Sequence, residues 1–245
     1  MNHATNGEFA VAPVRWFLAR LMAHTELDAE EQRAILKLTG QAAEISAGSV
    51  IARAGTTIAH AHLVARGLLA QFEEAEDGRR NATRLFIPGD LCGLQSVESP
   101  TVSWGLCAFT SCTVLHVPHD DLRKLVDRFP AIRKAFWKEM AIDASAQSKW
   151  TGNGVLKKSS ERAAHVICEL SLRTERAGHG DRNAFTLSAS QTQLSQVFGL
   201  TPIHTNRVVR DLREMGLITT TTRAISVKNW RGLAALADFD PTYLH

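Results

Sequence analysis

The chain has 245 residues, of which 44% are hydrophobic and 22% charged, and it carries a formal net charge of +3. This length allows one large domain or two small ones, and the composition is typical of an ordinary folded protein. No apolar run approaches the ~18 residues of a membrane-spanning helix, and no basic segment precedes an apolar core at the start, so we expect a cytoplasmic protein without a signal peptide.

The charge is unevenly distributed along the chain. Residues 1–154 hold 16 Lys/Arg and 17 Asp/Glu, whereas residues 155–232 hold 12 Lys/Arg and 6 Asp/Glu. A basic segment behind a nearly neutral one indicates a polyanionic partner for the C-terminal part, although a solvated basic surface would look the same.

The first 118 residues predict two helices followed by a β-rich region. The helical patterns lie within residues 14–38, and Asp28 is placed to cap the second helix. From residue 44 to 118, glycines recur about every dozen residues between short β-prone runs, a spacing typical of an antiparallel sandwich or barrel. Its clearest turns are Asp77-Gly78 and Pro88-Gly89-Asp90.

Two further helices and a flexible joint are predicted next. A short helix begins at Asp120 or Asp121 and stops before Pro130, which opens a long helix to about residue 150. The long helix has more than one apolar face, so it packs either within its own chain or against a second copy. The Gly-Asn-Gly sequence is predicted to end it, which places a domain boundary at residues 151–156.

A short helix and a turn are predicted from residue 188 onward. Ser188 and Gln191 form the S-x-x-Q pattern of a capping box, and a helix follows to about Phe198. Gly199 supplies a sharp turn. The small residue Ser195 lies where two crossing helices need space.

A second helix follows this turn, with Thr201 as its cap, Pro202 at its first position and Gly216 at its end. Its inward side and that of the first helix are apolar, which gives the pattern of a helix-turn-helix. The inward residues are Leu194, Phe198, Thr205, Val208, Val209 and Leu212.

The outward side of the second helix carries groups that can read DNA. Ile203, Asn206, Arg207 and Arg210 follow the i, i+3, i+4, i+7 spacing of one helix face. In a helix-turn-helix the start of this helix enters the major groove, where Asn binds adenine, Arg binds guanine and an apolar side chain meets a thymine methyl. The predicted DNA-binding residues are Thr192, Thr201, Pro202, Ile203, His204, Asn206, Arg207, Arg210 and Arg223.

Arg223 belongs to a predicted β-hairpin after the second helix. Residues 217–218 and 225–227 are short strand candidates, and residues 219–223 connect them. A hairpin at this place is a wing, and Arg223 at its tip is suited to contact a phosphate.

Three sequence blocks carry a family resemblance: PGDLCG at 88–93, RAAHVICELSLR at 162–173 and GLTPIHTNRVVRDLREMGLI at 199–218. Over nearly its whole length the chain resembles the Crp/Fnr superfamily of bacterial transcription regulators. The resemblance implies an α+β fold. Residues 1–129 would form N-terminal helices and an antiparallel, cyclic-nucleotide-binding-like β-roll sensor, residues 130–153 a long dimerisation helix and joint, and residues 154–245 a winged helix-turn-helix.

The resemblance also implies the function. Such proteins bind inverted-repeat operators as homodimers, and an activator would contact RNA polymerase. Arg207 falls at the family's base-contacting arginine. Pro202 and Ile203 stand where the cyclic-AMP regulator has charged residues, so its operator sequence does not transfer. We expect no enzymatic activity.

The effector position of the resemblance is Gly93, Leu94, Val102 and Ser103. Cyclic-AMP binders have a Glu after the glycine and an Arg-Ser pair later, whereas Leu94 and Val102 replace the Glu and the Arg here. A buried cyclic phosphate needs a charge partner, so cyclic AMP is not the expected effector. No cysteine precedes Cys92, which argues against the family's N-terminal iron–sulfur cluster. The effector stays unidentified, and the sequence requires no cofactor.

Two other classes of function stay open. His60 and His62 resemble the metal motif of cupins, and His116 and His119 could join them, which would give a metal-dependent β-roll enzyme with an appended helical domain. The Glu expected after the histidines is missing, and we predict no metal site. The four cysteines form no CxxC pair and are expected to be reduced core thiols. The remaining class is an interaction module without a DNA role.

Overall fold

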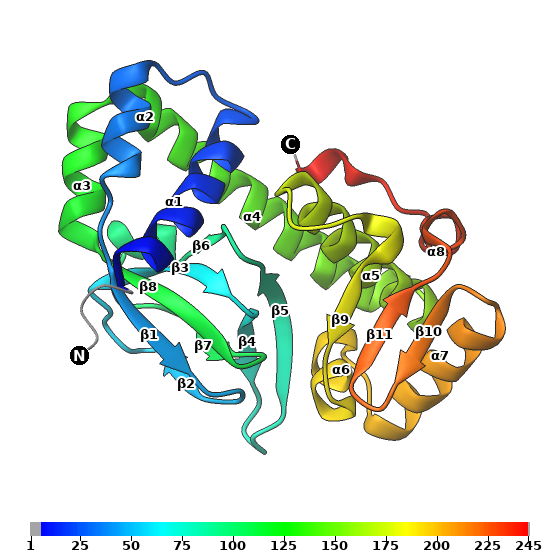
Figure 1. Cartoon of the computed structure of the whole chain (residues 1–245). Helices are drawn as coiled ribbons and strands as arrows, with labels where there is room; N and C mark the ends of the chain where they lie inside the picture. Colours follow the sequence, from blue (N-terminus) through cyan, green and yellow to red (C-terminus); the bar gives the residue numbers. More distant parts are fainter. Residues whose placement is uncertain (1–5, 245) are drawn as a thin grey trace. The chain divides into compact units, whose positions relative to one another are not determined.

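The computed structural model describes residues 6–244, which form two compact units (Figure 1). The first unit comprises the described residues up to Gln71 together with Phe86–Ala144, and the second comprises Phe72–Leu85 together with the chain from Ser145 onward. The predicted division after residues 129 and 153 differs from this one and stays a prediction. Within the described part, no helix combines the length and apolar composition that a membrane span requires.

The helices are α1 (Asn6–Met22), α2 (Ala29–Leu36), α3 (His119–Arg128), α4 (Pro130–Leu156), α5 (Ser159–Arg176), α6 (Gln191–Phe198), α7 (Pro202–Glu214) and α8 (Trp230–Ala237). The strands are β1 (Gln41–Ile45), β2 (Val50–Ala52), β3 (His60–Arg66), β4 (Leu69–Glu74), β5 (Arg80–Phe86), β6 (Leu91–Cys92), β7 (Gly105–Ala108), β8 (Cys112–Pro118), β9 (Thr186–Ser188), β10 (Ile218–Thr221) and β11 (Ala224–Val227).

The β-rich region forms two four-stranded sheets, in the orders β1-β8-β3-β6 and β2-β7-β4-β5. This confirms the predicted antiparallel roll. The predicted turns are present: Gly78 lies in the β4–β5 hairpin with φ of +78°, and Gly89 follows Pro88 with φ of +90°. Both conformations are left-handed and favour glycine.

Two apolar clusters hold the first unit together, one on each face of the β3–β8 pair. Alternate residues such as Leu63 and Leu115 pack against α1, α2, α3 and α4, and α1 lies on β3 (Figure 1). Val64 and Val114 lie in the other cluster, with Trp104 and Leu106. The period-2 alternation of a strand explains why both faces are buried.

A buried ion cluster ties the Pro-Gly-Asp turn to α1 and α4. Arg20 donates to Asp90 at 2.7 Å and to Glu139 at 2.6 Å, and His24 lies 2.5 Å from Glu139. Burial alone would raise the pKa of Glu139, but the charge of Arg20 and hydrogen bonds from His24 and Arg20 outweigh it and lower the pKa to about 2. Asp90 also accepts the Ile87 N–H at 2.8 Å. The Pro88-Gly89-Asp90 turn is therefore held in place by charged residues that lie far from it in the sequence.

Helix α4 does not end at the Gly-Asn-Gly sequence, so that prediction is wrong. The helix continues to Leu156, and the Lys157 N–H still donates to Asn153 O at 3.1 Å. Each glycine costs a helix about 1 kcal/mol. Trp150 and Asn153 are only 8% and 7% exposed on this last part of α4, and burying a side chain as large as Trp outweighs that cost.

The second unit contains α5, the helical pair α6–α7, the sheet β10-β11-β9 and α8. Helix α5 begins at Ser159 and carries Glu161 in its first turn. Its residues from Ala163 to Arg173 are all buried, and α8 packs against it. Helix α5 is therefore the central element on which the other helices of this unit rest.

Candidate DNA-binding surface

Helix α6 begins two residues later than the capping box predicted from the sequence. Ser190 is the N-cap: its hydroxyl accepts the Gln193 N–H at 3.3 Å, and the Gln193 side chain accepts the Ser190 N–H at 2.6 Å. The box assigned to Ser188 is wrong because Ser188 belongs to β9, where it pairs with Ala224. The same S-x-x-Q rule holds two residues further on.

The turn between α6 and α7 has the predicted geometry. Gly199 caps α6 with φ of +61°, and its N–H donates to Ser195 O. Ser195 is 7% exposed, and its hydroxyl donates to Thr192 O at 2.7 Å. A small, internally bonded side chain therefore lies at the crossing of the two helices.

Helix α7 starts and ends where the sequence predicted. Thr201 is its cap and accepts the His204 N–H at 3.4 Å, and Pro202 stands at the first helical position. Gly216 follows the helix with φ of +70°. The buried residues of α7 are Thr205, Val208 and Leu212, and those of α6 include Leu194 and Phe198.

The opposite face of α7 is exposed over its first turns. Ile203 is 80% exposed, and Asn206 and Arg207 are exposed beside it. Across residues 6–244, neither Asn206 nor Arg207 makes a side-chain hydrogen bond or ion pair with another part of the chain. Their donors are therefore available to base edges. Arg210, one turn further on, lies 3.8 Å from both Asp211 and Glu214, a separation at which an exposed ion pair contributes little.

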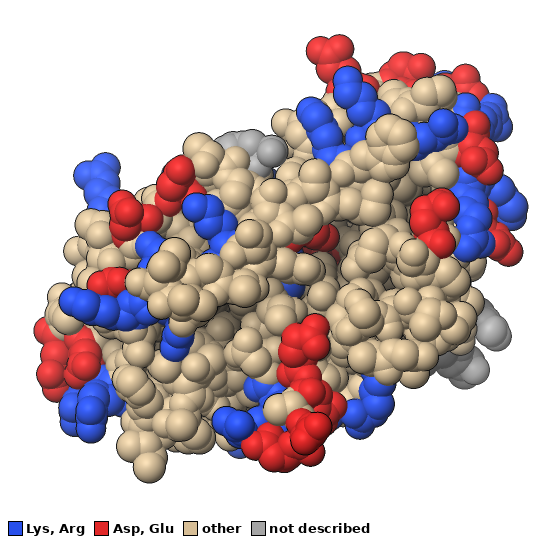
Figure 2. All heavy atoms as spheres, turned by 180° about the vertical axis from the view of Figure 1, so that it is seen from behind, with Lys and Arg blue, Asp and Glu red and all other residues tan. Residues whose placement is uncertain are grey.

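The remaining predicted contacts lie at the start of α7 and on α6. Thr192, Thr201, Pro202 and His204 are all exposed. Figure 2 shows one face of the molecule, on which Lys/Arg and Asp/Glu side chains lie next to one another in several groups that are separated by uncharged surface. Because both signs of charge are mixed on this face, the net charge does not identify a DNA-binding surface. The exposed side chains of α7 are the more specific indication of DNA binding.

A three-stranded sheet follows the helical pair. Strands β10 and β11 pair from Ile218↔Val227 to Thr221↔Ala224, so the turn contains only Thr222 and Arg223. Both strands are longer than predicted, and Arg223 is exposed at the tip as expected. Strand β9 is not among the predicted elements, because its alternating Thr-Leu-Ser pattern with buried Leu187 is only three residues long.

The second unit contains a buried network of charged side chains, which no sequence motif predicted. Glu169 on α5 is fully buried and accepts hydrogen bonds from Arg84 at 3.3 Å, Arg173 at 3.2 Å, Trp150 at 2.8 Å and Tyr243 at 2.7 Å. Burial would raise the pKa of Glu169, but the two arginines and the hydrogen bonds lower it below its ordinary value. The network joins β5, the end of α4, α5 and the C-terminal segment.

The four predicted effector positions have different environments. Gly93 has φ of +81°, and the Trp104 ring lies beside it, 3.6 Å from where a Cβ would stand. Val102 lies in the apolar cluster with Trp104, Leu94 lies in the cluster with the helices, and Ser103 is exposed. Leu94 and Val102 therefore belong to different apolar clusters, and the effector assignment of the four positions stays a prediction.

The histidines of the cupin-like motif make contacts with one another. His62 and His116 face each other across β3 and β8, with their Nδ1 atoms 2.9 Å apart. Burial and the neighbouring histidines lower the pKa of His62 to about 3. Within residues 6–244 no group of three or more His, Cys, Asp or Glu side chains is arranged to hold a metal ion, so the metal-enzyme alternative gains no support.

Comparison with known protein families agrees with this geometry. Residues 43–129 match the model of the cyclic nucleotide-binding domain, and residues 161–236 match that of the Crp-like helix-turn-helix domain. The chain belongs to the Crp/Fnr family of transcription regulators. Its helix-turn-helix is a DNA-binding domain of that type.

The similar proteins have low sequence identity to this Crp/Fnr chain, but their alignments cover most of its length. It is 22% identical over 220 residues to the transcriptional activator protein anr of Pseudomonas aeruginosa, covering 90% of both chains. It is also 22% identical to the anaerobic regulatory protein of Haemophilus influenzae, covering 81% of this chain and 77% of the relative.

Solved structures share the fold. FixK2 from Bradyrhizobium japonicum superposes with a TM-score of 0.70 at 20% identity, over 81% of this chain and 98% of FixK2. The c-di-GMP-responsive global regulator CLP of Xanthomonas campestris gives 0.63 at 18% identity, over 82% of this chain and 99% of CLP.

Proposed function

We propose that this chain regulates transcription as a cytoplasmic homodimer that reads an inverted-repeat operator. The observation that carries the proposal is the exposed face of α7, where Ile203, Asn206 and Arg207 stand at the end of the helix that enters the major groove in this domain type. In the proposed complex Arg207 bonds a guanine, Asn206 an adenine, and Ile203 meets a thymine methyl.

Phosphate contacts would fix the register of the helix on the duplex. Thr201 and His204 lie at the first turn of α7, where backbone N–H groups also face outward, and Thr192 lies nearby on α6. Arg223 on the wing and Arg210 further along α7 would add charge. These contacts carry no sequence information, so their loss should weaken binding to all DNA alike.

Helix α4 is the proposed dimer element. Trp137 is 63% exposed on this helix, whereas its neighbour Phe136 is 3% exposed and packs inside the first unit. A large exposed aromatic on a long helix favours burial against a second copy. The two α7 helices of such a dimer would lie about 34 Å apart, in successive major grooves.

The effector of the β-roll is proposed to be neither a cyclic nucleotide nor an iron–sulfur cluster. Leu94 and Val102 are buried apolar side chains at the positions where a cyclic phosphate would need charged partners. If the protein is an activator, it would also contact RNA polymerase. The proposed role is regulatory and requires no catalysis by the chain.

Selection of bound fragments from a random duplex library tests the DNA-binding proposal. At physiological salt the chain should enrich an inverted repeat whose half-sites are one helical turn apart, with or without cell extract as a source of effector. An Arg207→Ala variant serves as the control and should lose the enriched pattern. Failure of both selections, combined with an affinity for DNA that does not change with salt, would refute the DNA-binding function.

The dimer is tested separately by sedimentation. The wild-type chain should sediment as a dimer at micromolar concentration, and Trp137→Arg should shift it toward the monomer. A monomeric wild-type chain, with and without its selected DNA, would contradict the homodimer.

A further inference from the structure

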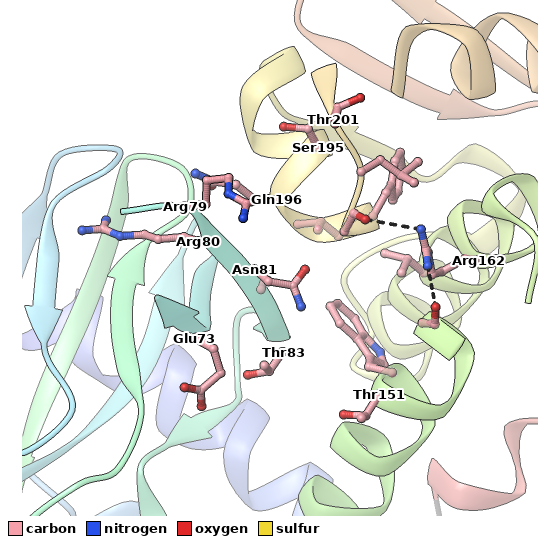
Figure 3. A pocket seen from close by; sticks show the side chains of 18 of the residues that line it. Glu73, Arg79, Arg80, Asn81, Thr83, Thr151, Arg162, Ser195, Gln196 and Thr201 are labelled. Carbon is pink, nitrogen blue, oxygen red and sulfur yellow. Dashed lines mark hydrogen bonds between the residues drawn. The ribbon is translucent and has the colours of Figure 1, made fainter. Parts of the chain in front are cut away.

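Arg162 on α5 connects the end of helix α4 with the turn between α6 and α7. Its Nη1 atom donates to Gly154 O at 2.9 Å, and its Nη2 atom donates to Gly199 O at 3.4 Å. Figure 3 shows both hydrogen bonds as dashed lines. Arg162 and Gly199 lie 37 positions apart, and all three residues belong to the second unit. One guanidinium group therefore links α5 to the end of α4 and to the helix-turn-helix.

The carbonyl of Gly154 is one that helix α4 leaves free at its C-terminal end. Gly154 lies in the last turn of α4, which ends at Leu156. The Lys158 N–H, which would bond Gly154 O if the helix continued, donates instead to Glu161 at 3.0 Å. The last carbonyl groups of a helix have no intrahelical donor, and a cation near them interacts favourably with the helix dipole. Arg162 supplies both the donor and the positive charge.

The second carbonyl belongs to the residue at which the helix-turn-helix changes direction. Gly199 has a left-handed φ of +61°, and its N–H donates to Ser195 O. Thr201, two residues later, caps α7. A hydrogen bond to Gly199 O therefore restrains the backbone immediately before the helix that enters the major groove in this domain type.

The guanidinium group is suited to hold two segments at once. It is planar and presents several N–H donors in a fixed fork, whereas the ammonium of a lysine is a compact point charge on a flexible stem. Arg162 is half-buried, so water competes less for its donors than at an exposed position. An arginine at this place therefore restrains both carbonyl groups with one rigid group.

We propose that Arg162 is a positioning residue that fixes the start of α7 relative to the end of α4. The consequence for DNA rests on the function proposed above, in which α4 joins two copies and each copy inserts α7 into one major groove. The bridge would then set the distance between the two α7 helices, and with it the half-site spacing that the dimer accepts. Arg162 contacts no base in this proposal and acts only through the carbonyl groups of Gly154 and Gly199.

The positioning is tested without DNA, by pulsed electron paramagnetic resonance on the full chain. Spin labels are attached through Thr151→Cys and Ile203→Cys, since both positions are exposed and the four native cysteines are buried. Dilution with unlabelled chain leaves only distances within one chain. The parent chain should give a narrow distance distribution, and Arg162→Gln should broaden it. Arg231→Gln, the same charge change on exposed α8, should leave it narrow. Equal widths for the parent and Arg162→Gln would overturn the proposal.

Operator spacing tests the consequence for DNA binding. The affinity for the selected inverted repeat is divided by the affinity for a repeat whose half-sites stand one base pair further apart. Arg162→Gln should lower this ratio about 10-fold, the factor that two net hydrogen bonds contribute. A variant that is merely less folded would lose both affinities alike and keep the ratio. An unchanged ratio would overturn the role of Arg162 in spacing.

The conservative variant separates the bridge from the charge. Arg162→Lys keeps a cation at the end of α4 but not the fork, so its ratio and its distance distribution should resemble those of Arg162→Gln. Full recovery by Lys would overturn the bridge, because charge alone would then suffice. A wild-type chain that binds no inverted repeat would contradict the function proposed above, and the distance distributions would still decide the role of Arg162.

Discussion

Replacing Glu169 by Gln should strongly destabilise the second unit. The carboxylate is fully buried and accepts four hydrogen bonds, two of them from the buried guanidinium groups of Arg84 and Arg173. The amide keeps the shape of the side chain but removes the negative charge. Both buried arginines would then lose the negative charge of Glu169 as a partner.

The expected magnitude follows from this burial. Removing one partner of a buried ion pair costs about 3–5 kcal/mol, because the remaining charge stays desolvated. A domain is stable by only about 5–15 kcal/mol, so Glu169→Gln should remove a third or more of the free energy of unfolding. The same network joins β5 to α5, so its loss should destabilise the contact of β5 with α5 as well as α5 itself.

Urea unfolding followed by tryptophan fluorescence measures this change, since Trp150 Nε1 donates to Glu169. The matched control is Glu175→Gln on the same helix. Its pair with Arg182, at 2.9 Å, has side chains 31% and 36% exposed, so its loss should cost about 0–1 kcal/mol. If Glu169→Gln costs no more than Glu175→Gln, the buried network does not stabilise the unit and the reasoning fails.

Four further outcomes are expected. Arg207→Ala should cost ~1–3 kcal/mol of specific binding and relax the base preference in competition assays; an equal loss on random DNA would make Arg207 a phosphate contact. Arg223→Ala should weaken binding to all sequences and flatten the salt dependence by about one unit, and an unchanged slope would place it outside the interface. Replacing Gly152 and Gly154 by Ala should raise the free energy of unfolding by about 0.5–1 kcal/mol each. Both glycines lie within α4, and a Cβ atom at either position meets no other atom. A decrease in the free energy of unfolding would show that the helix must break at this point. Burial holds the pKa of His165 at about 4 against 6.5, so only the unfolded chain binds this proton between those values. This residue should lower the stability by about 1.4 kcal/mol per pH unit as the pH drops through that window, and His165→Asn should reduce the measured slope by that amount in acid titrations followed by urea unfolding, while His62 keeps its own contribution.

Local signals predicted the helix-turn-helix well. Thr201 as cap, Pro202 at the first position and Gly199 in the turn act through backbone conformation and hydrogen bonds over a few residues, so they can be read in the chain itself. The same locality explains the two-residue error at α6: Ser188 and Ser190 both satisfy the capping rule, and only the pairing of β9 with β11 decides between them.

The sequence by itself determined the features whose causes are local: the two helices before the β-rich region, the turns at Gly78 and Gly199, and the apolar and exposed faces of α7. Tertiary structure alone decided where distant groups meet. Arg84 and Glu169 lie 85 positions apart, and no periodicity relates them. It also decided that α4 passes through its glycines, because burying Trp150 outweighs a helix-breaking cost of about 1 kcal/mol per glycine. Propensities of this size are overridden once the chain folds onto itself.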